Sequence, residues 1–279
     1  MKIAVIAAGE MGSGVGARLH RGGATVMTSL AGRGPASAER ARRAGMIAIA
    51  DDAELIAASD LVLSILPPAE AVALARRLAP ALAAAGGRVL YADCNAIAPA
   101  TVHEVGAIIA AAGCRFADVG IVGGPPRAEG YTPHLYASGE AVADLLPLRD
   151  LGLDIRPVAG GIGAASGLKL AYASLTKGLT AIAIAAARGA ANAGVADALR
   201  AEFAESQPQL LAWLQRQIPT VYPKAYRWVG EMEEIARALG ADPAGDMFMG
   251  AAGVYEGVAA AWADDGAPGL DFLATLYGR

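Results

Sequence analysis

The sequence contains few of the residues that build metal centres, disulfide frameworks and aromatic-rich sheets. Its 279 residues include two cysteines and three histidines, and aromatic residues make up 5% of the chain. Cys94 and Cys114 lack the paired spacing of a zinc site, so we expect two reduced thiols and no bound metal. The scarcity of aromatic side chains favours packing by alanine-rich helices over an aromatic-rich β-sandwich.

The chain also lacks an excess of positive charge and a long uncharged stretch. The formal net charge is -4, so no nucleic-acid partner is expected. Mean hydropathy is +0.40, yet no run without charged residues exceeds about a dozen positions, whereas a membrane-spanning helix needs about 20. The first residues predict a strand rather than a signal peptide. We therefore expect a cytoplasmic protein that binds a small molecule and no membrane.

Short apolar runs alternate with segments of helical periodicity over the first 160 residues. They lack polar alternation, which is typical of strands that are covered on both faces, and they predict an extended parallel sheet. Beyond residue 160 the pattern predicts helices alone, beginning with a long helix over about 164–193. We predict an α/β domain over 1–160 and an all-α domain over 161–279. The expected strands cover residues 2–8, 24–28, 46–49, 60–66, 88–92, 115–122, 133–138 and 154–158.

The first predicted strand runs directly into a glycine-rich turn and a helix. The stretch Ala7–Gly12 has glycine at two positions of the fingerprint G-x-G-x-x-G, with Ala7 at the first. Glycines there let backbone N–H groups at the helix N-terminus approach a pyrophosphate. At the start of an alternating α/β pattern, this turn indicates a Rossmann domain. The residues expected to contact the dinucleotide are Gly9, Glu10, Met11 and Gly12. The alternative is a glycine-rich turn that binds no ligand.

The end of the second predicted strand indicates which dinucleotide binds. NAD-preferring domains place a carboxylate there for the ribose 2′-OH, but the stretch Thr28–Arg33 contains none. Ser29 and Arg33 are suited to a 2′-phosphate instead, and a charged hydrogen bond of about 1.5 to 3 kcal/mol gives a preference of about ten- to a hundredfold. We predict NADP(H) rather than NAD. The alternative is that Arg33 is a solvated loop cation.

Further motifs follow in a characteristic order: Leu63–Pro68, Asp93–Pro99 and Gly161–Lys169. With the opening turn they cover about the first 180 residues, and the chain resembles the β-hydroxyacid dehydrogenase and 6-phosphogluconate dehydrogenase superfamily. Lys224–Ile235 is similar to a bacterial branch whose C-terminal half is a domain of unknown function. The resemblance implies an NADP(H)-dependent oxidoreductase that transfers hydride between nicotinamide and a small hydroxy acid, or a related secondary alcohol or carbonyl compound.

The resemblance also implies roles for particular residues. Lys169 is the expected general acid and base, while Tyr172 and Asn95 complete the catalytic group. Positions 169, 172, 176 and 180 fall on one stripe of a helix. The alternative is that Lys169 simply extends to solvent. Further cofactor contacts are expected at Leu66, Pro67 and Asn95, and substrate contacts at Val122, Gly123, Gly124, Lys169, Tyr172 and Thr176.

The chain departs from the superfamily pattern in its substrate-binding residues. Tyr172 and Ala173 stand where the hydroxyacid dehydrogenases carry asparagines, and Val122 stands where they carry a serine. These changes weaken the usual carboxylate clamp and leave the substrate unpredicted, although the backbone N–H groups of Gly123 and Gly124 remain suited to an anion. Two alternatives stay open. Imine reductases share the architecture but usually replace the lysine, and a non-catalytic NADPH-sensing protein would need no proton donor.

The C-terminal half is expected to form a homodimer, because the helical domain packs against a partner subunit in this superfamily. Trp228, Met232, Ile235 and Leu239 repeat at helical spacing and predict a core-facing stripe. The charged residues of the same segment lie on another face, where they complete the partner's site or form a solvated surface. These residues are Arg227, Glu231 and Glu234.

Overall fold

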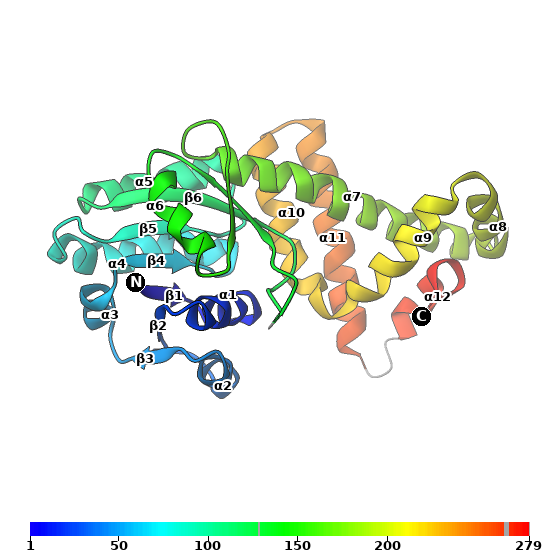
Figure 1. The fold of residues 1–279 in the computed structure, drawn as a ribbon. Helices are drawn as coiled ribbons and strands as arrows, with labels where there is room; N and C mark the ends of the chain where they lie inside the picture. Colours follow the sequence, from blue (N-terminus) through cyan, green and yellow to red (C-terminus); the bar gives the residue numbers. More distant parts are fainter. Residues whose placement is uncertain (128, 265–267, 279) are drawn as a thin grey trace. The chain divides into compact units, whose positions relative to one another are not determined.

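The computed structural model describes residues 1–127, 129–264 and 268–278. The chain forms two compact units, Met1–Leu170 and Ala171–Arg279 (Figure 1). The units divide after Leu170 rather than after residue 160, because the first turns of the long helix α7 (Ala164–Asn192) belong to the sheet-containing unit. Hydrogen bonds from the start of α7 to Asp118 attach those turns to the sheet.

The sheet of the first unit contains all the predicted strands and confirms the α/β class. Its eight strands lie in the order β3-β2-β1-β4-β5-β6-β7-β8. The pairing is parallel except between β6 and β7, which are antiparallel. Parallel strands need a crossover, and the described residues between β6 and β7 contain no helix. The strands are β1 Lys2–Ile6, β2 Thr25–Ser29, β3 Ile47–Ile49, β4 Leu61–Ser64, β5 Leu90–Asp93, β6 Arg115–Val122, β7 His134–Ser138 and β8 Asp154–Pro157.

Helices cover both faces of this sheet (Figure 1). Alternate strand residues enter two cores, with Ile3 and Val5 in one and Ala4 and Ile6 in the other. Burial on both faces explains why the strands lack polar alternation. The first core includes α1 (Glu10–Arg21), α2 (Pro35–Arg43), α6 (Val142–Leu145) and the 3₁₀ helix η2 (Leu146–Arg149). The second core includes α3 (Asp52–Ala58), α4 (Ala71–Ala84), which follows the 3₁₀ helix η1 (Pro68–Glu70), and α5 (Pro99–Ala111).

The second unit is helical, and its described residues contain no strand, as predicted. Trp228 and Tyr255 form an edge-to-face pair with ring centroids 5.1 Å apart, and the Tyr255 hydroxyl donates to the Lys177 carbonyl oxygen at 2.5 Å. These contacts join α7, α10 and α11. The elements are α7 from Ala171 onward, α8 Ala196–Ser206, α9 Pro208–Gln217, η3 Ile218–Thr220, η4 Tyr222–Lys224, α10 Ala225–Leu239, α11 Pro243–Ala263, η5 Pro268–Leu270 and α12 Asp271–Tyr277.

Helix α7 is long and apolar enough to cross a membrane by length and composition. Its most apolar window has a mean hydropathy of 1.4, and 44% of that window is buried within the structure. One such helix is weak evidence, because the core helix of a soluble protein meets the same criterion. Ala183, Ile184 and Ala187 of α7 are indeed packed inside the helical unit.

Candidate functional site

The glycine-rich turn joins the carboxyl end of β1 to α1. Gly9 occupies the N-cap of α1 and provides no side-chain hydrogen bond to the first turn. A Cβ atom on Gly12 would overlap the carbonyl oxygen of Ala7, so glycine is required for the close approach of α1 to β1. Glu10 is exposed and Met11 is partly buried beside the turn. The cradle fits the pyrophosphate of a dinucleotide, whose charge a helix N-terminus favours.

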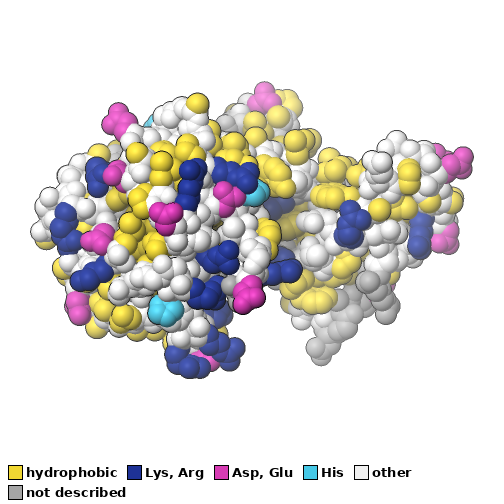
Figure 2. All heavy atoms as spheres, viewed as in Figure 1, with side chains coloured by type: hydrophobic (Ala, Val, Ile, Leu, Met, Phe, Trp, Pro, Cys, Tyr) yellow, Lys and Arg dark blue, Asp and Glu magenta, His cyan; other side chains and the backbone are white. Residues whose placement is uncertain are grey.

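The end of β2 places polar side chains where a ribose would lie. Ser29 is 6% exposed and its hydroxyl accepts from Ala31 N at 3.4 Å, while Arg33 is exposed on the following loop. Sequence reasoning missed Arg40 on α2. Its Nε donates to the Ala8 carbonyl oxygen at 3.1 Å, which ties α2 to the turn. Figure 2 shows Lys and Arg side chains gathered over α2, so this part of an acidic chain is locally basic.

Asn95 follows β5 and is turned into the protein. Its side-chain oxygen accepts from Leu66 N at 2.7 Å, and its Nδ2 donates to Ser64 Oγ and to Asp93 Oδ2, each at 2.9 Å. Asn95 is 2% exposed, so these contacts use most of its hydrogen-bonding capacity. In this structure Asn95 fixes the loop that contains Leu66 and the exposed Pro67.

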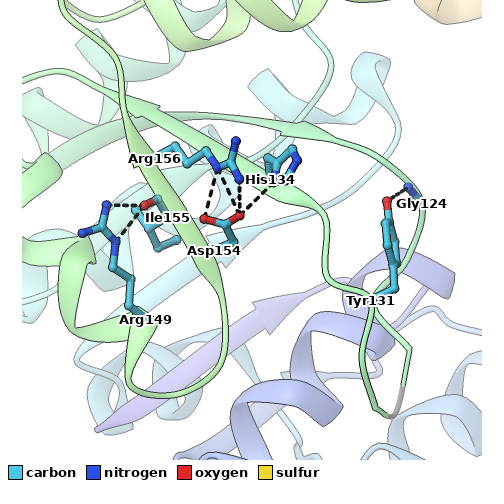
Figure 3. Close-up of polar contacts among 7 residues, drawn as sticks. All are labelled: Gly124, Tyr131, His134, Arg149, Asp154, Ile155 and Arg156. Carbon is cyan, nitrogen blue, oxygen red and sulfur yellow. Dashed lines mark hydrogen bonds and ion pairs between the residues drawn. The ribbon is translucent and has the colours of Figure 1, made fainter.

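The loop after β6 is held by Tyr131, which sequence reasoning also missed. The Tyr131 hydroxyl accepts from Gly124 N at 3.0 Å (Figure 3). The expectation that the Gly123 and Gly124 N–H groups both remain open to an anion is therefore wrong for Gly124. Gly123 has a φ of 126°, and a Cβ there would overlap the Tyr131 hydroxyl. Val122 is partly buried and has no hydroxyl group. The Tyr131 hydroxyl accepts from Gly124 N and can still donate its own proton to another group.

Lys169 lies on the part of α7 that packs on β6. A Cβ atom built on Gly120 would be 3.0 Å from Lys169 Cβ and 2.6 Å from the Ala165 carbonyl oxygen, so the helix rests directly on the strand backbone. Lys169 is partly buried, and it forms no ion pair with any residue that the structure describes. The motifs around Gly9, Leu66, Val122 and Lys169 thus gather where the strands of the first unit end.

Tyr172 and Thr176 belong to the helical unit. Tyr172 is 53% exposed. The Thr176 hydroxyl donates to the Tyr172 carbonyl oxygen at 3.0 Å, and that of Thr180, which is fully buried, donates to the Thr176 carbonyl oxygen at 2.8 Å. The threonine hydroxyls therefore bond to their own helix, as threonine commonly does within helices.

Two acidic residues of α10, Glu231 and Glu234, pair with basic residues of the same unit. Glu231 Oε2 lies 2.5 Å from Lys177 Nζ, and Glu234 pairs with Arg237. Trp228, Met232 and Ile235 are buried as predicted, but the prediction is wrong for Leu239, which is 46% exposed at the last residue of α10.

Two buried carboxylates lie side by side beneath the gathered motifs. Asp93 and Asp118 are register partners on β5 and β6, and each is at most 1% exposed. Burial raises the pKa of Asp93 to about 7, against hydrogen bonds from Asn95 that lower it, while the charge of Asp118 raises it further. Cys94 and Cys114 are buried and unpaired. No group of three or more potential metal ligands is found among the described residues.

Comparison with known proteins identifies the family of the first unit. Residues 2–144, just over half of the chain, match the family described as the NAD binding domain of 6-phosphogluconate dehydrogenase. The chain belongs to this family. Within this 6-phosphogluconate dehydrogenase-like protein, residues 190–258 match a second family, a domain of unknown function (DUF1932). The predicted combination of domains is confirmed.

Solved structures show that the fold extends over the whole chain. A conserved protein of unknown function, described as structurally similar to 3-hydroxyacid dehydrogenases, is 24% identical with a TM-score of 0.72, over 99% of both chains. The 3-hydroxyisobutyrate dehydrogenase of Mycobacterium tuberculosis, solved with L-serine, is 24% identical with a TM-score of 0.71, over 99% of this chain and 97% of that one. Psf3, solved with NADP+ and 2-OPP, is 21% identical with a TM-score of 0.63, over 89% and 91%.

Proposed function

We propose that this protein is an NADP(H)-dependent oxidoreductase that interconverts a small hydroxy acid, or a related secondary alcohol, and its carbonyl form. The NAD-binding family and the hydroxyacid dehydrogenase-like fold support an oxidoreductase. The observation that carries the proposal is Lys169, which is partly buried, makes no ion pair among the described residues and packs on Gly120 near the carboxyl end of β6.

The residues around the first turn fit the cofactor. The turn from Gly9 to Gly12 would hold the pyrophosphate, while Ser29 and Arg33 would hold the 2′-phosphate. The locally basic α2 supports the phosphorylated form, and Psf3 is a fold relative that was solved with NADP+. The loop at Leu66, shaped by Asn95, would border the nicotinamide end. When bound, NADP(H) supplies or accepts the hydride.

The protein's own contribution is orientation and a proton. The Lys169 amine would donate a proton to the substrate oxygen during reduction and accept one from the hydroxyl during oxidation. Tyr172 and Thr176 follow Lys169 along α7, and their contact with the substrate stays a prediction from the sequence. The Tyr131 hydroxyl, which accepts from Gly124 N, would offer its proton to an anionic group of the substrate.

Turnover by Lys169 variants tests this function. Wild type would be assayed with NADP+ against 3-hydroxyisobutyrate and L-serine, and with NADPH against a 2-oxo acid, a semialdehyde and a cyclic imine. We expect Lys169→Ala to lose about 10² to 10⁴ in kcat while the NADPH Kd changes less than about twofold. Lys224→Ala, at an exposed position, is the matched control. Undiminished turnover in Lys169→Ala would refute the assignment, and NADPH binding without any turnover would favour a sensor.

Cofactor preference is tested separately by calorimetry. Because Arg33 is exposed at the end of β2 where the 2′-phosphate would lie, we expect Arg33→Ala to raise the NADPH Kd about ten- to a hundredfold and to leave NADH binding unchanged. Arg21→Ala removes an exposed arginine from the last turn of α1 and serves as the control. Equal affinity of wild type for NADPH and NADH would contradict the NADP assignment.

We also propose that the helical unit forms a homodimer through α7. Large apolar side chains are exposed at helical spacing along one face: Tyr172 by 53%, Leu175 by 77%, Leu179 by 38% and Ile182 by 56%. Exposed apolar patches of this kind mark interaction surfaces. A second copy presenting the same stripe satisfies the symmetry of a two-fold interface.

A further inference from the structure

A row of four buried polar side chains crosses the sheet from β4 to β7. Strand register aligns Ser64 on β4 with Asp93 on β5, Asp93 with Asp118 on β6, and Asp118 with Ser138 on β7. We call these four residues the polar row, and each of them is at most 1% exposed. Buried polar groups are costly unless they are hydrogen-bonded, so their partners identify what the polar row holds.

At its β4–β5 end the polar row holds Asn95. Asn95 N donates to Asp93 Oδ1 at 3.0 Å, and Asn95 Nδ2 donates both to Asp93 Oδ2 and to Ser64 Oγ at 2.9 Å. Because both hydrogens on Nδ2 are used, the amide has one orientation, which directs its oxygen to Leu66 N. The loop that follows β4 is fixed in this way.

At its β6–β7 end the polar row holds the start of α7. Asp118 Oδ2 accepts from Gly163 N at 3.0 Å, Ser166 N at 3.1 Å and Ser138 Oγ at 3.0 Å, while Asp118 Oδ1 accepts from Ser166 Oγ at 2.5 Å. Ser138 Oγ in turn accepts from Ala165 N at 3.0 Å. Helical hydrogen bonding leaves the first N–H groups unpaired, and a carboxylate at this end is electrostatically favourable.

The same face of β6 that binds the helix start also lies beneath Lys169. Asp118 and Gly120 are two residues apart on the strand and therefore face the same side. Ser166 and Lys169 are three residues apart on α7 and lie on one helix face. The bond from Ser166 to Asp118 and the contact of Lys169 with Gly120 thus belong to one helix–strand interface.

We propose that the polar row is a platform that holds Lys169 and the loop at Leu66 in one fixed geometry. Asp118 is the positioning residue for Lys169, and Asp93 is the positioning residue for Asn95. The proposal rests on the proposed role of Lys169 in proton transfer. A displacement of about 1 Å at a reacting group can cost about 10²-fold in rate, so a loosened helix start lowers turnover without removing any group that touches the substrate.

The test compares Asp118→Ala, Asp118→Asn and Ser166→Ala with a matched buried serine. The control is Ser59→Ala, because the Ser59 hydroxyl is fully buried and donates to the Leu55 carbonyl oxygen at 2.7 Å ahead of β4. Ser59→Ala and Ser166→Ala thus each lose one buried hydroxyl hydrogen bond. If Asp118→Ala does not fold, Ser166→Ala carries the test.

The position of Lys169 can be read without any substrate. The chain contains four lysines, Lys2, Lys169, Lys177 and Lys224, so reductive ¹³C-dimethylation gives few signals, and Lys→Arg variants assign them. We expect the chemical shift of the Lys169 signal to change in Asp118→Ala and Ser166→Ala. The Lys177 signal stays constant in these variants, and both signals stay constant in Ser59→Ala.

Kinetics provide the second readout. We expect kcat at saturating NADPH to fall about ten- to a hundredfold in Asp118→Ala, with the NADPH Kd within about twofold of wild type. Asp118→Asn restores much of the rate, because an amide can accept from the backbone N–H groups and donate to Ser166 Oγ. A Lys169 signal in Ser166→Ala that matches Ser59→Ala overturns the proposal. A wild-type protein without turnover would defeat the proposed function alone, because the Lys169 signal still decides the role of the polar row.

Discussion

The buried ion pair of the helical unit gives a stability prediction with a defined magnitude. Lys177 Nζ on α7 lies 2.5 Å from Glu231 Oε2 on α10, and each side chain is 17% exposed. Lys177 Nζ is also 4.8 Å from the ring centroid of Trp228. Removing one member of a buried pair costs about 3 to 5 kcal/mol, because the remaining charge stays desolvated and loses its counter-charge. Their partial exposure places Glu231→Gln at the lower end, about 3 kcal/mol.

Urea unfolding followed by tryptophan fluorescence measures this loss in the right part of the molecule. All three tryptophans, Trp213, Trp228 and Trp262, lie in the helical unit. The double variant Lys177→Met/Glu231→Leu should lose less stability than Glu231→Gln alone, since it removes the ammonium group together with the carboxylate that it contacts. An unchanged urea midpoint in Glu231→Gln would refute this reasoning. Glu231 would then not stabilise its own unit, and the alternative roles in a partner's site or on a solvated surface would stay open.

Further predictions concern the sheet unit and the exposed stripe. Gly120→Ala would press a methyl group on the Ala165 carbonyl and on Lys169, so kcat should fall about tenfold while circular dichroism is unchanged. Burial raises the pKa of Asp93 to about 7, so the folded protein keeps a proton that the unfolded chain releases above about pH 4. The free energy of unfolding therefore falls by up to about 4 kcal/mol as the pH rises to about 7. In Asp93→Asn the urea midpoint should no longer fall with pH over this range. Leu175→Glu with Ile182→Glu should give a monomer in sedimentation, whereas Val195→Glu, at a position 49% exposed outside the stripe, should not.

The fold was largely predictable because its signals are local. Strands covered on both faces are continuous apolar runs, and each predicted run forms a strand. The direction of β7 was missed because apolar runs carry no information about direction. The described residues between Val122 and His134 form no helix, whereas a parallel neighbour needs a crossover. The unit boundary depends on hydrogen bonds that Asp118 accepts from the start of a helix more than forty residues away, which no local pattern reveals.

The candidate site was predictable only where a motif is local. The turn from Gly9 to Gly12 combines strand, turn and helix within a few residues, and its geometry follows from the sequence. Tyr131 and Arg40 were missed because their contacts, with Gly124 and with Ala8, depend on how separate elements pack. Asn95 was recognised by its motif, yet its contacts with Asp93 and Ser64 arise from strand register.

The two lysines of α7 show how the fold can keep one amine available for proton transfer. Lys177 is committed to Glu231 and to the face of Trp228, and a carboxylate in direct contact favours the charged form of a lysine. Lys169 belongs to the same helix–strand interface as Asp118, but Asp118 is occupied by N–H and O–H donors at the start of α7, and Asp93 by Asn95. The polar row therefore fixes the helix that carries Lys169 without pairing its amine. An acid placed in direct contact with Lys169 would hold the proton that the proposed reaction must transfer.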